Sequence, residues 1–385
     1  MIGSVGKRWG RPTLAGDLGG AFGDLGTLLP FAAGAIALGL CRPAGLLVSV
    51  GLAYLLVAGV YRLPVAVQPM KAVGAIVLTT ATDPETLAAC GLVLAAVIAA
   101  IGLSRIVERA ARLVPRSLIH GLQAGLGLTL SVAAIRLILS DPWIGLACAG
   151  LAALALLWNV ALAPVAVLLG GAGFAWLAGG TSQPAASLAA GGLPLLPDLA
   201  HFLKAVPQLA LAQLPLTLTN AILLTEILAR RYFPDGGQRV TIRRLSLTTG
   251  LMNLVAAPLG GLPLCHGAGG LAAHVRFGAR SWLAPAAIGL LLLAAGLFAA
   301  EPAARALLAL PPAAVGVLLL VAGVELLPVA AFREARPSCR PVILATALAT
   351  VAFNPLIGLV AGTVAEALRW GVLRLLLRSR EDLRG

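Results

Sequence analysis

Apolar stretches of roughly 17–25 residues follow one another along almost the whole chain, and each is long enough to cross a hydrocarbon core of about 30 Å. Of the 385 residues, 59% are hydrophobic and only 11% are charged. A soluble domain of this size could not bury so much apolar surface. The sequence therefore predicts an all-α polytopic membrane protein with the lipid bilayer as its surroundings.

Charges and prolines divide these stretches into about 14 predicted transmembrane segments. The third, tenth and thirteenth are short or interrupted by Gly and Pro, so they are not expected to span the bilayer as regular helices. The segments lie near residues 22–40, 43–61, 64–81, 85–103, 116–139, 142–158, 160–178, 205–229, 245–262, 263–275, 281–300, 312–332, 340–354 and 356–376.

Positive charges are distributed very unevenly between the loops that these segments define. With the N-terminus inside, 23 of the 28 Lys and Arg residues fall on the inner side and 4 on the outer side, and Lys71 lies within a segment. This asymmetry follows the positive-inside rule, predicts an even number of crossings and places both termini in the cytoplasm. The same asymmetry explains the net charge of +13, so this charge does not indicate that the protein binds nucleic acid. The excess of Arg over Lys, with abundant Ala and Gly, indicates a GC-rich bacterial genome and an inner-membrane location.

Enzyme and metal motifs are missing from the sequence. The five cysteines are scattered and lack CxxC spacing, which argues against a disulfide framework or a zinc site. Walker A, HExxH and GxSxG patterns do not occur, so direct ATP drive and an enzyme are not expected. We expect no catalytic residues, no metal and no cofactor.

The two halves of the chain resemble each other. A shift of 199 positions aligns Gly51-Leu52 with Gly250-Leu251 and Leu63-Pro64 with Leu262-Pro263. We predict a first repeat over residues 1–178, an extracytoplasmic linker over 179–204 and a second repeat over 205–385. Seven segments per half make the repeat inverted. Transporters of this kind bind their solute near the midplane, where discontinuous helices from both halves meet.

The interrupted segment of the first half contains a candidate anion site. In LPVAVQPMK (Leu63–Lys71), Pro69 suits the first turn of a half-helix that begins inside the membrane. The free N–H groups of such a helix attract anions, Gln68 can reach a ligand, and Lys71 adds a full charge. The alternative is a proline kink in an ordinary helix, with Lys71 extending to an interface.

The second half offers a matching segment, LPLCHGAGG (Leu262–Gly270). Its glycines would let a ligand approach the backbone closely. His266 could donate to an anion or exchange a proton. The alternative is close helix packing through small residues around a buried, hydrogen-bonded histidine.

Polar residues in the first segment of each half complete the expected pocket. Asp24 is a candidate proton carrier or a partner for Lys71, and Gln213 and Glu226 occupy the corresponding segment of the second half. Glu325 and Glu366 are assigned mainly structural roles beside nearby arginines. The candidate proton-coupling residues are Asp24, Glu226 and His266. The candidate substrate-binding residues are Asp24, Thr27, Gln68, Pro69, Met70, Lys71, Gln213, Cys265, His266, Gly267, Ala268 and Gly269.

At these residues the chain resembles the molybdate transporter family, which is related to the sulfate permeases. The blocks that carry the resemblance are GDLGTLLPF (Gly23–Phe31), PVAVQPMKA (Pro64–Ala72), QLPLTLTNA (Gln213–Ala221), GLMNLV (Gly250–Val255) and PLCHGAGGLA (Pro263–Ala272) with HVRFGAR (His274–Arg280). The resemblance implies a seven-plus-seven inverted repeat with a core domain (spans 1–4 and 8–11) and a gate domain (spans 5–7 and 12–14). It also implies an oxyanion bound between the half-helices of spans 3 and 10.

The resulting hypothesis is a secondary active importer of molybdate that works by alternating access and is coupled to protons. Sulfate and tungstate stay open as further substrates of such a molybdate importer. Two alternative functions also stay open: a transporter of the same fold for sulfate, bicarbonate or a nucleobase, and an anion channel. The expected partners are a small inorganic oxyanion and the lipid bilayer, with no nucleic acid; a homodimer stays open.

Overall fold

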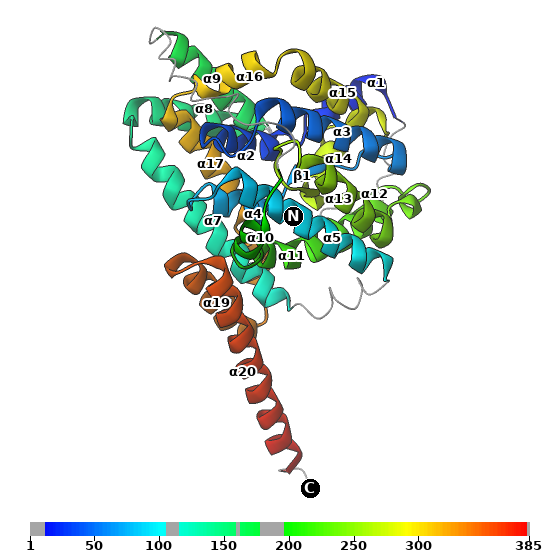
Figure 1. The fold of residues 1–385 in the computed structure, drawn as a ribbon. Coiled ribbons are helices and arrows are strands. Elements are labelled where there is room, and N and C mark those ends of the chain that lie inside the picture. The colour runs from blue at the N-terminus through cyan, green and yellow to red at the C-terminus, as the bar shows by residue number, and fades with distance from the viewer. Residues whose placement is uncertain (1–11, 105–114, 159–161, 178–195, 383–385) are drawn as a thin grey trace.

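The computed structural model describes residues 12–104, 115–158, 162–177 and 196–382, most of them helical (Figure 1). Its N-terminal half contains α1 (Leu14–Ala21), α2 (Leu25–Ala37), α3 (Pro43–Tyr61), β1 (Val67–Pro69), α4 (Lys71–Val77), α5 (Pro84–Leu103), α7 (Arg116–Ile138), α8 (Pro142–Trp158) and α9 (Leu162–Leu177). The C-terminal half contains α10 (Leu199–Ala205), α11 (Leu211–Leu216), α12 (Thr225–Tyr232), α13 (Ile242–Ala256), β2 (Leu264–His266), α14 (Ala268–Arg276), α15 (Leu283–Phe298), α16 (Ala300–Leu308), α17 (Pro312–Leu326), α18 (Val329–Glu334), α19 (Arg340–Ala352) and α20 (Pro355–Asp382).

The helices follow the apolar segments of the sequence. Within the described ranges, six helices are long and apolar enough to cross a membrane, or seven if the bent pair α15 and α16 is counted as one span. The third and tenth predicted segments are each a short strand followed by a half-helix, β1–α4 and β2–α14. The count of 14 crossings stays a prediction, because several of the other helices are shorter than a bilayer is thick.

The predicted linker 179–204 falls largely on residues 178–195, which lie outside the described residues. Its last part is helical, because α10 begins at Leu199. Asp198 starts this helix with a capping box: its carboxylate accepts the backbone N–H of His201, and the His201 ring accepts the backbone N–H of Asp198. This reciprocal pairing satisfies two N–H groups that a helix start leaves unpaired.

A single bent helical path of 34 residues runs from Leu199 to Tyr232. Two π-helical stretches, Val206–Ala210 and Thr217–Leu224, interrupt it on either side of α11. Pro207 and Pro215 lie in or just before these stretches and cannot donate backbone hydrogen bonds, which favours a wider turn. Gln213 of α11 and Thr217, the first residue of the second π-helical stretch, are both buried.

Packing divides the helices into two groups (Figure 1). In one group α3 packs on α15 and α5 packs on α13, and both strands and both half-helices belong to it. In the other group α7 packs on α17 and α19, α8 packs on α9, and α19 packs on α20. The groups meet where α2 touches α17 and α9, and where α4 touches α7. This division corresponds to the core and gate domains that the sequence predicts.

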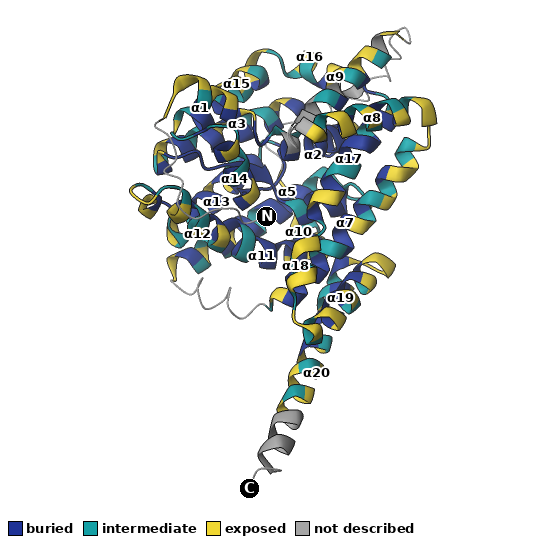
Figure 2. Ribbon diagram, turned by 180° about the vertical axis from the view of Figure 1, so that it is seen from behind, coloured by how far each residue is buried: buried dark blue, intermediate teal, exposed yellow. Residues whose placement is uncertain are grey.

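Buried residues concentrate inside the first group, while the outer helices expose apolar faces (Figure 2). The helix α20 extends furthest from the rest of the molecule, and its apolar side chains include Leu368 and Trp370, which are 66% and 54% exposed. In water such a surface would aggregate, whereas acyl chains cover it at no cost. The exposed faces are therefore the surface that a bilayer solvates.

Candidate functional site

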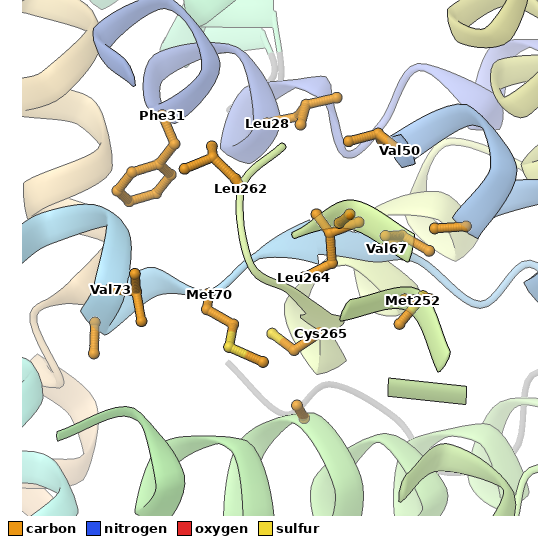
Figure 3. Packing of buried hydrophobic residues seen from close by; sticks show 14 of the residues in the cluster. Leu28, Phe31, Val50, Val67, Met70, Val73, Met252, Leu262, Leu264 and Cys265 are labelled. Carbon is orange, nitrogen blue, oxygen red and sulfur yellow. The ribbon is translucent and has the colours of Figure 1, made fainter. Parts of the chain in front are cut away.

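The two interrupted segments cross each other in the middle of the first helix group. The strands β1 and β2 pair antiparallel, with Val67 opposite His266, Gln68 opposite Cys265 and Pro69 opposite Leu264. Figure 3 shows the two strands side by side, with Met70 and Cys265 at the crossing. Extended backbone inside a membrane must have its hydrogen bonds satisfied within the protein, and this pairing does so. As a result, α4 and α14 begin next to each other.

Side chains from α13 hold the second strand in place. The Asn253 amide donates to the carbonyl of Leu264 (2.6 Å) and accepts from its N–H (2.8 Å). His266 is fully buried, with its Nε2 2.7 Å from the Thr248 hydroxyl and its Nδ1 3.4 Å from the carbonyl of Ala66. Both ring nitrogens of His266 are therefore engaged with the protein itself.

Asp24 lies in the short break between α1 and α2, at the level of the crossing. Its carboxylate accepts hydrogen bonds from the Tyr54 hydroxyl (3.3 Å) and from the Gln68 amide, and it is almost fully buried. The same Gln68 amide donates to the Thr27 hydroxyl at 3.3 Å. Asp24, Gln68 and Thr27 thus form one connected polar wall.

Lys71 is the first residue of α4 and is half-buried. It acts electrostatically on Asp24, on Cys265 and on Glu325. A charged amine at this depth needs compensation, and Asp24 and Glu325 are the carboxyl groups with which it interacts. The sequence alternative of an ordinary kinked helix does not describe this segment, because the chain is extended up to Pro69 and helical only from Lys71.

The N-terminus of α4 is not open in the way that the sequence suggests. The Gln213 side-chain oxygen accepts the backbone N–H groups of Ala72 (2.9 Å) and Val73 (3.3 Å), and its amide donates to the Thr217 hydroxyl at 2.9 Å. Gln213 therefore caps the half-helix from the opposite repeat. The sequence places Gln213 near the site, but its role as the acceptor for these N–H groups could not be predicted.

The N-terminus of α14 is open by contrast. In the described part of the chain, no acceptor is bound to the backbone N–H groups of Ala268, Gly269 and Gly270. Gly269 is exposed although its neighbours are buried, and a Cβ built on it would meet nothing within 4 Å. A Cβ on Gly267 would overlap the Gln68 side chain, and one on Gly270 would come within 2.6 Å of Asp24. The glycines keep this helix end accessible and let the polar wall lie against it.

The other residues that the sequence suggested for the site lie either at the paired strands or away from the polar wall. Pro69, Met70, Cys265 and Ala268 are buried in or beside the paired strands and shape the crossing. Glu226 pairs with Arg230 on its own helix, 2.9 Å away, so the structure does not bring its carboxylate into this polar wall. Glu366 has the structural role expected for it, because it contacts Arg369, Ser117 and Trp370.

Glu325 is the residue whose position the sequence analysis missed. Among the described residues it forms no ion pair with an arginine, and it interacts electrostatically with Lys71 and Asp24. The available signal was an isolated acid in the apolar run of α17, and such residues inside membranes are usually functional.

Comparisons with known proteins identify the family to which the chain belongs. The family model described as a molybdate transporter of the MFS superfamily matches residues 16–130 and 205–326, more than half of the chain. Molybdate transporter 1 of Arabidopsis thaliana is 28% identical over 409 residues, which cover 92% of this chain and 88% of the plant protein.

Solved structures show the fold. The transmembrane domain of the cyanobacterial bicarbonate transporter BicA aligns with a TM-score of 0.62 and 18% identity, over 91% of this chain and 97% of that one. The murine Slc26a9 anion transporter in its inward-facing state aligns with a TM-score of 0.68 and 15% identity, over 95% of this chain and 69% of that one. Both have the seven-plus-seven inverted repeat, so the predicted fold class is confirmed. The chain belongs to the molybdate transporter family, and it is a membrane transporter and not an enzyme.

Proposed function

We propose that this chain is a secondary active transporter that imports molybdate together with protons. The observation that carries the proposal is the match of both halves to the molybdate transporter family, in the regions that form the crossing. The geometry supports it, because one cation and one open helix N-terminus lie beside the same polar wall. Positive groups that converge on a small space suit an anion with several equivalent oxygens.

In this proposal the oxyanion lies between the Lys71 ammonium and the first turn of α14. The backbone N–H groups of Ala268, Gly269 and Gly270 would donate to its oxygens, and the exposed face of Gly269 is the side of approach. The half-helix α4 contributes mainly through Lys71, since Gln213 occupies two of its N–H groups. Gln68 and Thr27 form the adjacent wall.

The three sequence candidates for proton coupling differ in how the surrounding contacts support them. Asp24 interacts with Lys71 and lies in the polar wall. His266 uses both ring nitrogens for bonds to Thr248 and Ala66, and Glu226 forms its ion pair with Arg230. The contacts therefore favour a coupling group near Lys71. Transport would follow from movement of the helix group that carries α4 and α14 against the group that carries α7 and α17.

We further propose that the protein lies in a bacterial inner membrane with both termini in the cytoplasm, as the charge asymmetry predicts. Uptake of radiolabelled molybdate into proteoliposomes tests the function. We expect saturable uptake driven by an inward proton gradient, abolished by a protonophore and reduced by excess tungstate. Stronger competition by sulfate, bicarbonate or uracil than by tungstate would reassign the substrate, and non-saturable uptake would indicate a channel.

A further inference from the structure

The pairing of β1 with β2 (Figure 3) has a register that continues past both strands. Met70 lies opposite Pro263 in this register, and its N–H donates to the Pro263 carbonyl at 2.8 Å. Hydrogen-bonded pairs of an antiparallel ladder recur at every second residue. The pairs that follow are therefore Gln68 with Cys265, Ala66 with Gly267, and Pro64 with Gly269.

The second segment leaves this ladder where it turns into α14. A continued ladder would bring the N–H of Gly269 to the carbonyl of Pro64. One pair earlier, it would bring the N–H of Gly267 to the carbonyl of Ala66. The helix begins at Ala268 instead, and among the described residues neither N–H group has an acceptor. Both carbonyls belong to buried residues, so they require donors from elsewhere.

Two buried histidine rings of the second repeat take the place of the missing backbone donors. The Nδ1 of His274 is 3.0 Å from the carbonyl oxygen of Pro64, and the Nδ1 of His266 is 3.4 Å from that of Ala66. Because a carbonyl oxygen only accepts, Nδ1 is the protonated nitrogen of each ring. The His274 bond has the ordinary length of a protein hydrogen bond, whereas the His266 bond is long.

We infer that His274 is a positioning residue of the oxyanion site. It satisfies the carbonyl of Pro64 and thereby leaves the N–H of Gly269 free for the ligand. This inference rests on the proposed function, which places the oxyanion at Gly269, and deepens it by naming the residue that keeps this donor available. His274 acts through Gly269, because its own ring is fully buried while Gly269 is exposed.

The other ring nitrogen of His274 does not explain why a histidine is present. Its Nε2 is buried and has no hydrogen-bond partner among the described residues. A buried polar atom without a partner is unfavourable, so an apolar side chain would be the better choice for packing alone. The bond from Nδ1 to Pro64 is therefore the contact that accounts for a polar residue at this position.

The far end of α14 is anchored separately. The Arg280 guanidinium donates to the carbonyls of Val275 and Ala279, at 2.6 Å each. The Asp17 carboxylate accepts the backbone N–H groups of Arg280 (2.6 Å) and Ser281 (2.9 Å). Because this end is held by α1, loss of the His274 bond is expected to act mainly on the first turn of the helix.

The test compares His274→Leu with His274→Asn, two side chains of nearly the same shape of which only asparagine offers a donor near the position of Nδ1. Calorimetry should show that His274→Leu binds molybdate about tenfold more weakly than His274→Asn, as loss of one buried hydrogen bond predicts. The control is His120→Leu on α7, which should bind like the natural chain. Equal affinities in the folded Leu and Asn variants would overturn the inference.

Hydrogen–deuterium exchange without any oxyanion gives a second readout, in the peptide that contains residues 267–270. In His274→Leu the Gly269 N–H should take the vacated carbonyl of Pro64, so exchange should be slower than in the natural chain and in His274→Asn. Faster exchange would mean that the segment is only loosened, and would refute the positioning role. This readout needs no ligand. Failure of the natural chain to bind molybdate, tungstate and sulfate would instead overturn the proposed function.

Thermal unfolding shows whether each variant is folded. Should His274→Leu not fold, nitrogen NMR of the natural chain with labelled histidine provides the decision, and His274→Asn identifies the signal that belongs to His274. The inference requires a protonated Nδ1 and an unprotonated Nε2 on this ring. The opposite tautomer would leave Pro64 without its donor and would refute the role.

Discussion

At the scale of single residues, the site depends on how a few charges are compensated inside an apolar body. Lys71 lies near the crossing and interacts electrostatically with the buried carboxyl group of Asp24. An oxyanion that binds there exchanges this arrangement for contacts to its own oxygens. The balance is delicate, because a buried charge that loses its partner is strongly unfavourable.

Lys71→Ala should therefore reduce molybdate affinity by roughly tenfold to a hundredfold, the value of a charged hydrogen bond of about 1.5–3 kcal/mol. Lys71→Arg should restore part of the affinity, because it keeps the charge. The control is Lys204→Ala, which removes an exposed lysine on α10. Calorimetric titration with molybdate measures the effect, and an unchanged dissociation constant in Lys71→Ala would remove this residue from the site.

Gly269→Val tests the proposed approach to α14. The new side chain meets no protein atom near its Cβ, so the fold should tolerate it, but it occupies the space in front of the open N–H groups. We expect molybdate binding to be lost with little change in melting temperature. Gly59→Val on α3 is the matched control, because a Cβ there also meets nothing within 4 Å. Normal binding by Gly269→Val would contradict the proposed position of the oxyanion.

At the scale of elements, most of the helix positions could be predicted because apolar runs bounded by charge and proline determine them. The crossing of the third and tenth segments could also be predicted, since Pro69 and the glycines after His266 mark where extended chain turns into helix. The short helices α1 and α16 and the π-helical turns were not predicted. Their sequences resemble those of ordinary spans, and only packing distinguishes them.

The side-chain contacts between helices that are distant in the chain could not be predicted from the sequence. Gln213 caps a helix whose N–H groups lie 141 and 140 positions earlier in the chain. Such pairings depend on how the repeats fold against each other and leave no local periodicity or spacing in the sequence. The polar residues could be identified as candidates, but their partners could not.

Gln213→Leu should destabilise the protein, because it leaves two buried N–H groups of α4 without an acceptor, at a cost of about 1–3 kcal/mol each. The control is Gln208→Leu, which changes an exposed glutamine on the same helical path. Thermal unfolding in detergent compares the two. A lower melting temperature only in Gln213→Leu supports the capping role, and equal melting temperatures would argue against it.

At the scale of the whole molecule, the charge asymmetry predicts which end of the structure faces the cytoplasm, and a native thiol allows this to be tested. Cys339 lies in a short turn between Arg336 and Arg340, on the arginine-rich side. It is half-buried, whereas the four other cysteines are buried, so it is the thiol that a reagent reaches most easily. The positive-inside rule places this turn in the cytoplasm.

A membrane-impermeant maleimide should therefore leave Cys339 unlabelled in intact bacterial spheroplasts and label it in inverted vesicles. Cys339→Ser should remove the signal from the vesicles, which identifies the labelled site. Labelling in spheroplasts would reverse the orientation of the chain. Because both repeats insert as one inverted pair, this single position determines the side of every loop.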